Sequence, residues 1–275
     1  MSTLGFAQPG SEIYLFDLKI RKDKIIISNG KNITNHKGYD NQPYFHPNEP
    51  LIYYSQADTS GRTDILVYDY SKNSTKKITE TSEREFSPTV TPDSKFLSCI
   101  IQRDDGVQDL AKYPLAGGTP IVLINNLKVG YHAWVNETDL ILFVLGEPHT
   151  LRWYSLSSKK DTIIASNIGR SMHAIPKSSE MSFVDKSADP WVIKKLETKT
   201  RIATNITAAL PGREDLSWTP DGKIIMSDGE KLYYFDPGTS DGWTEIEGMS
   251  TLELKGVTRL SVNKKGNKIA IVASE

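Results

Sequence analysis

The stretches Pro47-Asn48-Glu49, Pro92-Asp93-Ser94 and Pro220-Asp221-Gly222 repeat one pattern, a polar turn placed directly before an apolar run. The first two are 45 residues apart, and the 128 residues from Pro92 to Pro220 are close to three further units. Degenerate copies occupy the remaining places, at Trp134-Val135-Asn136-Glu137, Ile175-Pro176-Lys177-Ser178 and Val262-Asn263-Lys264-Lys265-Gly266. A period of about 40–45 residues with short strands is typical of propeller blades, whereas helical arrays of that period need amphipathic helices.

Each repeat contains the pattern of four short strands. An apolar run follows the turn, a polar reversal follows that run, and a third strand rich in Ile, Leu and Tyr comes next. The third strands are expected at Glu12 to Asp17, Asp64 to Asp69, Leu110 to Pro114, Leu151 to Tyr154, Trp191 to Lys195 and Lys231 to Asp236. A shorter fourth strand closes most units, as in Lys76 to Thr79. The sequence therefore predicts an all-β, six-bladed β-propeller with four-stranded antiparallel blades.

The two ends of the chain are expected to complete one blade. The last repeat, at Lys264, lacks its third and fourth strands, and the segment from Glu12 to Thr34 supplies that pair. Because such a ring has no free half, we expect a single domain over residues 12–275. Residues 1–11 form a tail in which Leu4-Gly5-Phe6-Ala7-Gln8 resembles the end of a secretory signal, and the alternative is a frayed cytoplasmic N-terminus.

Charge and cysteine content narrow the range of partners. Lys and Arg total 33 and Asp and Glu total 34, so a net charge of −1 argues against general nucleic-acid binding. No apolar run approaches the roughly 18 residues of a membrane-spanning helix. The single cysteine, Cys99, lies in an apolar strand and is expected to be a small buried hydrophobic residue.

The best copies of the repeat carry a resemblance to a known family. Pro43-Tyr44-Phe45-His46-Pro47-Asn48, Ser87-Pro88-Thr89-Val90-Thr91-Pro92-Asp93 and Leu216-Ser217-Trp218-Thr219-Pro220-Asp221-Gly222-Lys223 resemble the TolB-like, WD-like β-propeller repeats. The resemblance covers nearly the whole chain and implies a six-bladed propeller in the periplasm or outside the cell. Most such modules bind proteins or glycans, some precede a serine-peptidase domain, and some are metal-dependent lyases of pectin fragments that use a histidine cluster. A fold shared by so many activities decides none of them.

Catalytic motifs are sparse in this sequence. It has no Gly-x-Ser-x-Gly elbow, which argues against the peptidase, and no His-Glu-x-x-His helix, cysteine pair, glycine-rich phosphate loop or complete calcium loop. The segment from Asp58 to Asp64 lacks the terminal bidentate Glu of such a loop and is interpreted as a turn.

Two histidines share one register of neighbouring blades. His132 and His173 each lie four residues before the repeat turn, where the other blades have Pro43, Pro88, Leu216 and a residue near Leu260. These positions start the innermost strands, so two neutral imidazoles there are candidates for binding one divalent metal or an anionic ligand. Further ligands would come from Tyr131, Gln42, Asp40, Asp215 or His46. The alternative is that both histidines are packed, hydrogen-bonded strand residues, and the turn position of His46 favours a structural role.

The segments that lead into the six innermost strands are the second candidate site. In propellers these connections surround one mouth of the central channel, where mixed charges and aromatic rings can hold a peptide, a loop or a sugar. The alternative is an ordinary solvated loop surface. The candidate binding residues are Tyr39, Asp40, Arg84, Glu85, Tyr131, Arg170, Arg213, Glu214, Asp215 and Arg259.

Two functions follow as hypotheses. The first is a non-enzymatic, monomeric binding module of the cell envelope, periplasmic or extracellular, that presents one propeller face to a protein or glycan partner and needs no cofactor. A cytoplasmic location is the alternative. The second function is a metal-dependent carbohydrate-active lyase or hydrolase with His132 and His173 as ligands of a divalent metal.

Overall fold

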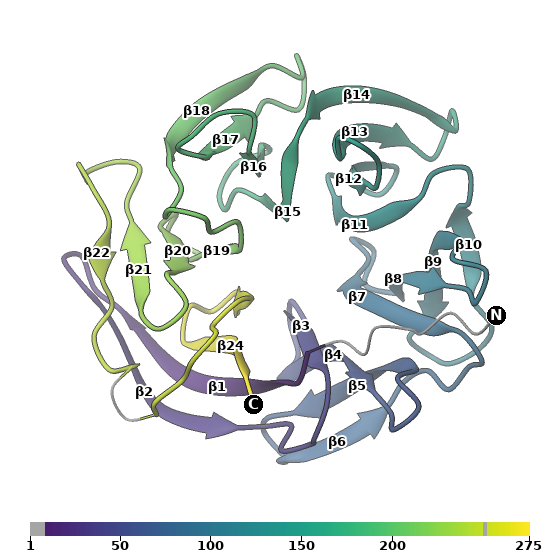
Figure 1. Cartoon of the computed structure of the whole chain (residues 1–275), viewed down its shortest axis with the longest axis horizontal. Coiled ribbons are helices and arrows are strands. Elements are labelled where there is room, and N and C mark those ends of the chain that lie inside the picture. The colour runs from purple at the N-terminus through teal and green to yellow at the C-terminus, as the bar shows by residue number, and fades with distance from the viewer. Residues whose placement is uncertain (1–8, 250–251) are drawn as a thin grey trace.

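The computed structural model describes residues 9–249 and 252–275, which form six four-stranded antiparallel sheets around a central axis (Figure 1). This arrangement confirms the predicted all-β six-bladed propeller. The described residues contain no α-helix, and accordingly none that is long and apolar enough to span a membrane.

The four strands of each blade are arranged side by side in order from the central axis to the rim. The innermost strands are β3 (Asp40–Phe45), β7 (Arg84–Val90), β11 (Val129–Trp134), β15 (Ile168–Ala174), β19 (Leu216–Trp218) and β23 (Leu260–Val262). The second strands are β4 (Leu51–Ala57), β8 (Phe96–Gln102), β12 (Asp139–Val144), β16 (Met181–Asp185), β20 (Ile224–Ser227) and β24 (Lys268–Ser274). The third strands are β5 (Thr63–Asp69), β9 (Gln108–Pro114), β13 (Thr150–Ser155), β17 (Val192–Leu196), β21 (Leu232–Phe235) and β1 (Ser11–Ile20). The outer strands are β6 (Ser74–Lys77), β10 (Ile121–Ile124), β14 (Lys160–Ser166), β18 (Ala203–Ala208), β22 (Thr244–Glu245) and β2 (Ile25–Asn32).

All six repeat turns connect a first strand to a second strand, and their side chains explain why the pattern recurs. The hydroxyl of Thr219 donates to Asp221 at 2.6 Å, and the next residue, Gly222, has a φ of 104° that favours glycine. His46 takes the threonine position in its blade, and its Nδ1 accepts the backbone N–H of Glu49 at 2.9 Å. The structural role expected for His46 is therefore the one that the structure shows.

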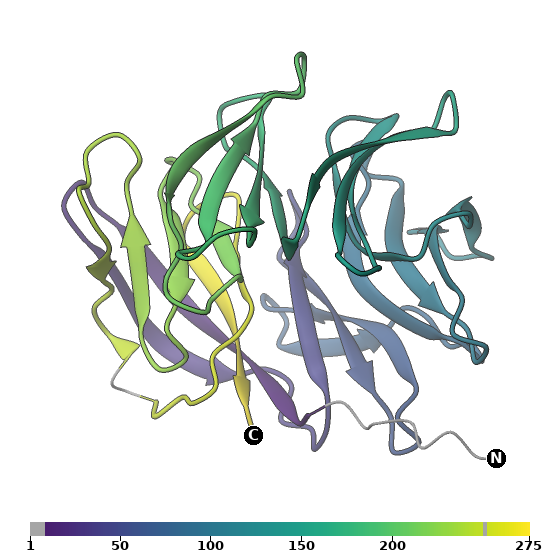
Figure 2. The ribbon, with the colours of Figure 1, turned by 45° about the horizontal axis from the view of Figure 1, so that its top comes forward.

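The head and tail of the chain share one blade, as predicted. Strand β1 pairs with β24 from Ser11 opposite Ser274 to Asp17 opposite Lys268, and the sheet order is β2-β1-β24-β23 (Figures 1 and 2). Strand β1 starts at Ser11, one residue before the boundary that the sequence predicts, because the backbone of Ser11 already pairs with Ser274. The stretch compared with a secretory signal, Leu4 to Gln8, lies outside the described residues.

The apolar core lies between neighbouring blades. Each of the six blade-to-blade contacts has its own cluster of buried side chains, including Ile141 with Phe183 in one and Phe16 with Ile225 in another. Cys99 is fully buried in the blade formed by β7 to β10, as expected for a small hydrophobic residue. Because every blade buries apolar surface against two others, the ring holds the innermost strands in fixed positions around the axis.

Candidate functional site

The central channel contains two cavities that share part of their lining. The wide cavity has a volume of about 550 Å³ and lies toward the repeat turns, whereas the narrow cavity of about 390 Å³ lies toward the segments that lead into the innermost strands. Four residues line both cavities, and we call this shared part of the lining the waist: Gln42, Tyr131, Arg170 and Arg259. Cavities of this size suit a small molecule or the end of a chain.

The register that the sequence predicts for the innermost strands holds around the whole ring. The six equivalent positions, four residues before each repeat turn, all line the wide cavity: Pro43, Pro88, His132, His173, Leu216 and Leu260. In two blades the residue before the proline bends the strand, because Gln42 and Ser87 have φ values of 60° and 56° and the strand register shifts there. The amide oxygen of Gln42 accepts the backbone N–H of Ser87 at 2.6 Å, which fastens one bulge to the next.

A pair of charges braces the waist. Arg170 binds both carboxylate oxygens of Asp215 on the neighbouring blade, at 3.0 Å from Nε and 2.6 Å from Nη2. Burial would raise the pKa of Asp215, but the hydrogen bonds of Arg170 and the charges of Arg259 and Arg170 outweigh it and keep that pKa below its usual value. The carboxylate of Asp215 is therefore ionised at neutral pH.

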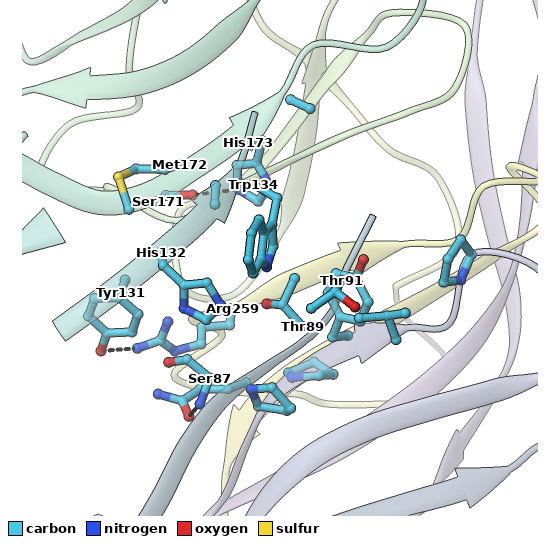
Figure 3. A pocket seen from close by; sticks show the side chains of 18 of the residues that line it. Ser87, Thr89, Thr91, Tyr131, His132, Trp134, Ser171, Met172, His173 and Arg259 are labelled. Carbon is cyan, nitrogen blue, oxygen red and sulfur yellow. Dashed lines mark hydrogen bonds between the residues drawn. The ribbon is translucent and has the colours of Figure 1, made fainter. Parts of the chain in front are cut away.

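The ring of Tyr131 lies at the waist, and those of Tyr39 and Phe86 line the narrow cavity. The Nη2 of Arg259 donates to the hydroxyl of Tyr131 at 2.7 Å, and its guanidinium carbon lies 4.9 Å from the centre of that ring (Figure 3). Tyr39 contacts Phe86 edge to face, with 6.4 Å between the ring centres. Burial raises the pKa of Tyr39 to about 12 against the opposing effect of Arg259, so its hydroxyl is neutral.

His132 is held by a serine of the preceding blade. Its Nε2 lies 2.8 Å from the hydroxyl of Ser98, which also accepts the indole N–H of Trp134 and donates to the carbonyl of Thr89. Burial lowers the pKa of His132 to about 3, so the ring is neutral. Among the described residues its Nδ1 has no hydrogen-bond partner although it is buried, and the side chain lines the wide cavity.

His173 is also tied to a serine, on its own strand. Its Nε2 lies 2.9 Å from the hydroxyl of Ser171, and burial lowers its pKa to about 4 (Figure 3). The two histidines thus line one cavity, but each has its Nε2 in a hydrogen bond within the protein. The described residues contain no group of three or more His, Cys, Asp or Glu side chains able to hold a metal ion. Two imidazoles fall short of the three protein ligands of a typical catalytic zinc site, so the described side chains do not by themselves fit a divalent metal.

Half of the predicted binding residues lie on the channel and half do not. Tyr39, Tyr131, Arg170, Asp215 and Arg259 line one or both cavities. The remaining five of the ten candidates line neither: Asp40, Arg84, Glu85, Arg213 and Glu214.

The five residues away from the cavities have structural contacts. Glu85 is fully buried and accepts the hydroxyls of Thr81 and Tyr113 at 2.5 and 3.0 Å. Arg84 pairs with the exposed Asp104 at 2.9 Å, Arg213 donates to the carbonyl of Asp228, and Glu214 pairs with Lys186 at 3.1 Å. Asp40 is also fully buried and accepts the amide of Gln56 at 2.6 Å.

The sequence analysis missed the apolar wall of the wide cavity. Trp134 and Met172 lie there with the prolines of the innermost strands and of two repeat turns (Figure 3). Trp134 and Trp218 both stand two residues before a repeat turn, and each indole N–H donates to a serine of the preceding blade, Ser98 or Ser182. The shared position of the two tryptophans in their repeats was the sequence signal for these side chains. It marks a hydrogen bond between neighbouring blades, and in the case of Trp134 the side chain also lines the cavity.

The fold and this channel define a six-bladed β-propeller with a polar waist. Solved structures with the same fold include the putative TolB from Agrobacterium tumefaciens, at 14% identity and a TM-score of 0.72, with 98% of this chain and 99% of that one covered. TolB from Acinetobacter baumannii is similar at 12% identity and a TM-score of 0.61, over 96% of this chain and 65% of that one. An oligogalacturonate lyase in complex with manganese is similar at 11% identity and a TM-score of 0.62, over 92% of this chain and 83% of that one. No family model and no curated protein matches the sequence. Two of these three structures are TolB proteins, and at these identities the likeness shows the fold alone.

Proposed function

We propose that this protein is a non-enzymatic, monomeric binding module of the cell envelope that receives part of a protein or glycan partner in its central channel. The observation that carries the proposal is the pair of cavities in the central channel, which share the waist residues Gln42, Tyr131, Arg170 and Arg259. Similarity to TolB structures supports a binding role in the periplasm or outside the cell. The wide cavity also supports it, since apolar walls with a few polar groups are typical of binding sites.

A bulky residue at the mouth of the wide cavity should block binding. Ala174 is exposed at the end of β15 and lines that cavity, so Ala174→Trp fills the opening without disturbing a packed side chain. We expect ligands found by a thermal-shift screen of peptides and oligosaccharides to bind Ala174→Trp at least tenfold more weakly than the wild type, as measured by calorimetry. Ile163→Trp is the matched control, because Ile163 is 54% exposed on outer strand β14. Equal binding to both variants would contradict a channel site.

The second candidate is a metal-dependent carbohydrate-active lyase or hydrolase. Two observations favour it: the similarity to an oligogalacturonate lyase structure with manganese, and the position of His132 and His173 on one cavity wall. This function requires ligands beyond the two imidazoles.

Metal binding gives a direct test of this second function. If it is correct, manganese should raise the Tm of the wild type, because a ligand that binds only the folded state stabilises it. His173→Gln should abolish that shift while leaving the metal-free Tm close to that of the wild type. An unchanged wild-type Tm at millimolar Mn²⁺, Zn²⁺ and Ca²⁺, together with no metal by elemental analysis, would remove this candidate.

A further inference from the structure

The walls of the channel are positively charged although the protein as a whole is not. The charged side chains that line the wide cavity are Arg170, Arg259, Lys264 and Asp215, and those that line the narrow cavity are Arg170 and Arg259. Three cations thus face one anion in a chain with a net charge of −1. Low-dielectric walls concentrate this excess of positive charge, which favours an anionic ligand.

At the waist, the excess of positive charge comes from Arg259. Arg170 is neutralised by Asp215 through two hydrogen bonds, whereas in the described part of the chain Arg259 has no carboxylate within ion-pair distance. A guanidinium has five N–H donors, and the hydroxyl of Tyr131 takes one of those of Arg259. Arg259 borders both cavities, so its free donors can be reached from either mouth.

Two residues that line the wide cavity have a buried polar atom without a hydrogen-bond partner in the described part of the chain. The hydroxyl of Ser98 has one hydrogen, which it donates to the carbonyl of Thr89 at 3.0 Å, so the Nε2 of His132 is the donor toward Ser98. The Nδ1 of His132 is then an acceptor. Within residues 9–249 and 252–275 it has no partner, although the side chain is only 8% exposed. The hydroxyl of Ser87, on the same cavity, is likewise buried and without a partner in those residues. Buried polar atoms of this kind are normally hydrogen-bonded, but both are closed off from solvent, so a ligand in the cavity reaches them only if neighbouring side chains move.

We propose, building on the binding function above, that the channel recognises a terminal carboxylate, which Arg259 holds by paired hydrogen bonds at the waist. The planar fork of a guanidinium matches the two oxygens of a carboxylate, and Tyr131 keeps this fork in place through its ring and hydroxyl. The innermost strands surround the waist, so the group that reaches it belongs to a small acid or to the free end of a chain. The C-terminus of a peptide and a free small carboxylic acid share this chemistry.

The test compares acids with their neutral amides. The probes are acetyl-Ala-Ala with a free C-terminal carboxylate, the same peptide as an amide, propionate and propionamide, each titrated by NMR or calorimetry. We expect each acid that binds to be at least about tenfold tighter than its amide, and Arg259→Gln to remove that preference. Tighter binding of the peptide acid than of propionate identifies a peptide C-terminus, and equal binding identifies the free carboxylate as the whole ligand.

Control variants separate charge from folding. Arg84→Gln removes an arginine that lines neither cavity, so its acid binding should equal that of the wild type. Arg259→Lys keeps the charge and loses the fork, and an affinity between those of the wild type and Arg259→Gln supports paired hydrogen bonds. Equal affinity for acid and amide, unchanged acid binding by a folded Arg259→Gln, or no wild-type binding of either acid at millimolar concentration would overturn the proposal. If neutral ligands still depend on an open Ala174 mouth, the binding function stands while the carboxylate preference fails.

Discussion

Replacing Ile271 by alanine should lower the free energy of unfolding by about 2–5 kcal/mol. Ile271 lies on β24, pairs with Tyr14 on one side and Leu260 on the other, and is fully buried in the cluster between the shared blade and the blade formed by β19 to β22. Alanine leaves a cavity in this cluster, and the packed side chains around the cavity limit how far it can collapse. Urea denaturation followed by tryptophan fluorescence measures the change.

A matched substitution on the rim provides the control. Ile163→Ala removes the same atoms from β14, where the side chain is 54% exposed, so we expect a change within about 0.5 kcal/mol. If Ile271→Ala lowered the free energy of unfolding as little as Ile163→Ala does, packing in the closing blade would not be important for the stability of the ring.

The second large effect concerns Asp40 and pH. Burial raises the pKa of Asp40 to about 7, against the hydrogen bond from Gln56 and the charge of His36, while the charge of Glu12 raises it further. Gln56 lies on β4, His36 in the segment before β3, and Glu12 on β1. Tyr54 on β4 is also close to Asp40, whose charge raises the pKa of the Tyr54 hydroxyl. Since the carboxyl of an unfolded Asp has a pKa of ~3.9, the folded state holds the proton more tightly.

The sign of the pH effect follows from this difference. The contribution of Asp40 to stability is fully present below about pH 4 and is lost as the pH rises toward 7. Asp40→Asn cannot ionise, so the Tm of the variant minus that of the wild type should increase from pH 4 to pH 8, on the order of 5 °C. Asp104→Asn is the control, because it removes a carboxylate that is 75% exposed. Parallel Tm profiles for Asp40→Asn and the wild type would contradict a buried, proton-holding Asp40.

The ring was predictable from the sequence because its turns have a local cause. The Thr-Pro-Asp-Gly stretch at Thr219 fixes a reversal through its own side chains, so its copies mark the same place in each blade. The incomplete repeat at Lys264 and the unmatched strand at Glu12 then predicted the shared blade, and the structure confirms it. The same register brings His132 and His173 to the lining of one cavity.

The details of the site depended on contacts between distant residues. Sequence spacing gives no sign that Ser98 binds His132, 34 residues away, or that Arg170 pairs with Asp215, 45 residues away. Residues that are neighbours in a strand point to opposite faces, so a segment near the channel mouth contains both lining and buried side chains. The bulges at Gln42 and Ser87 shift this alternation further. Glu85 and Asp40 were therefore assigned to the mouth, although both are buried.

The shared blade also has a consequence for how the protein is made. Lys268 on β24 binds Asp17 on β1 across 251 residues of chain, so the ribosome must produce five complete blades before the sixth can close. Until then β1 presents an unpaired backbone edge, which can pair with other nascent chains. Biosynthesis thus passes through an open intermediate whose lifetime is set by translation speed, and chaperones have that interval in which to protect the edge.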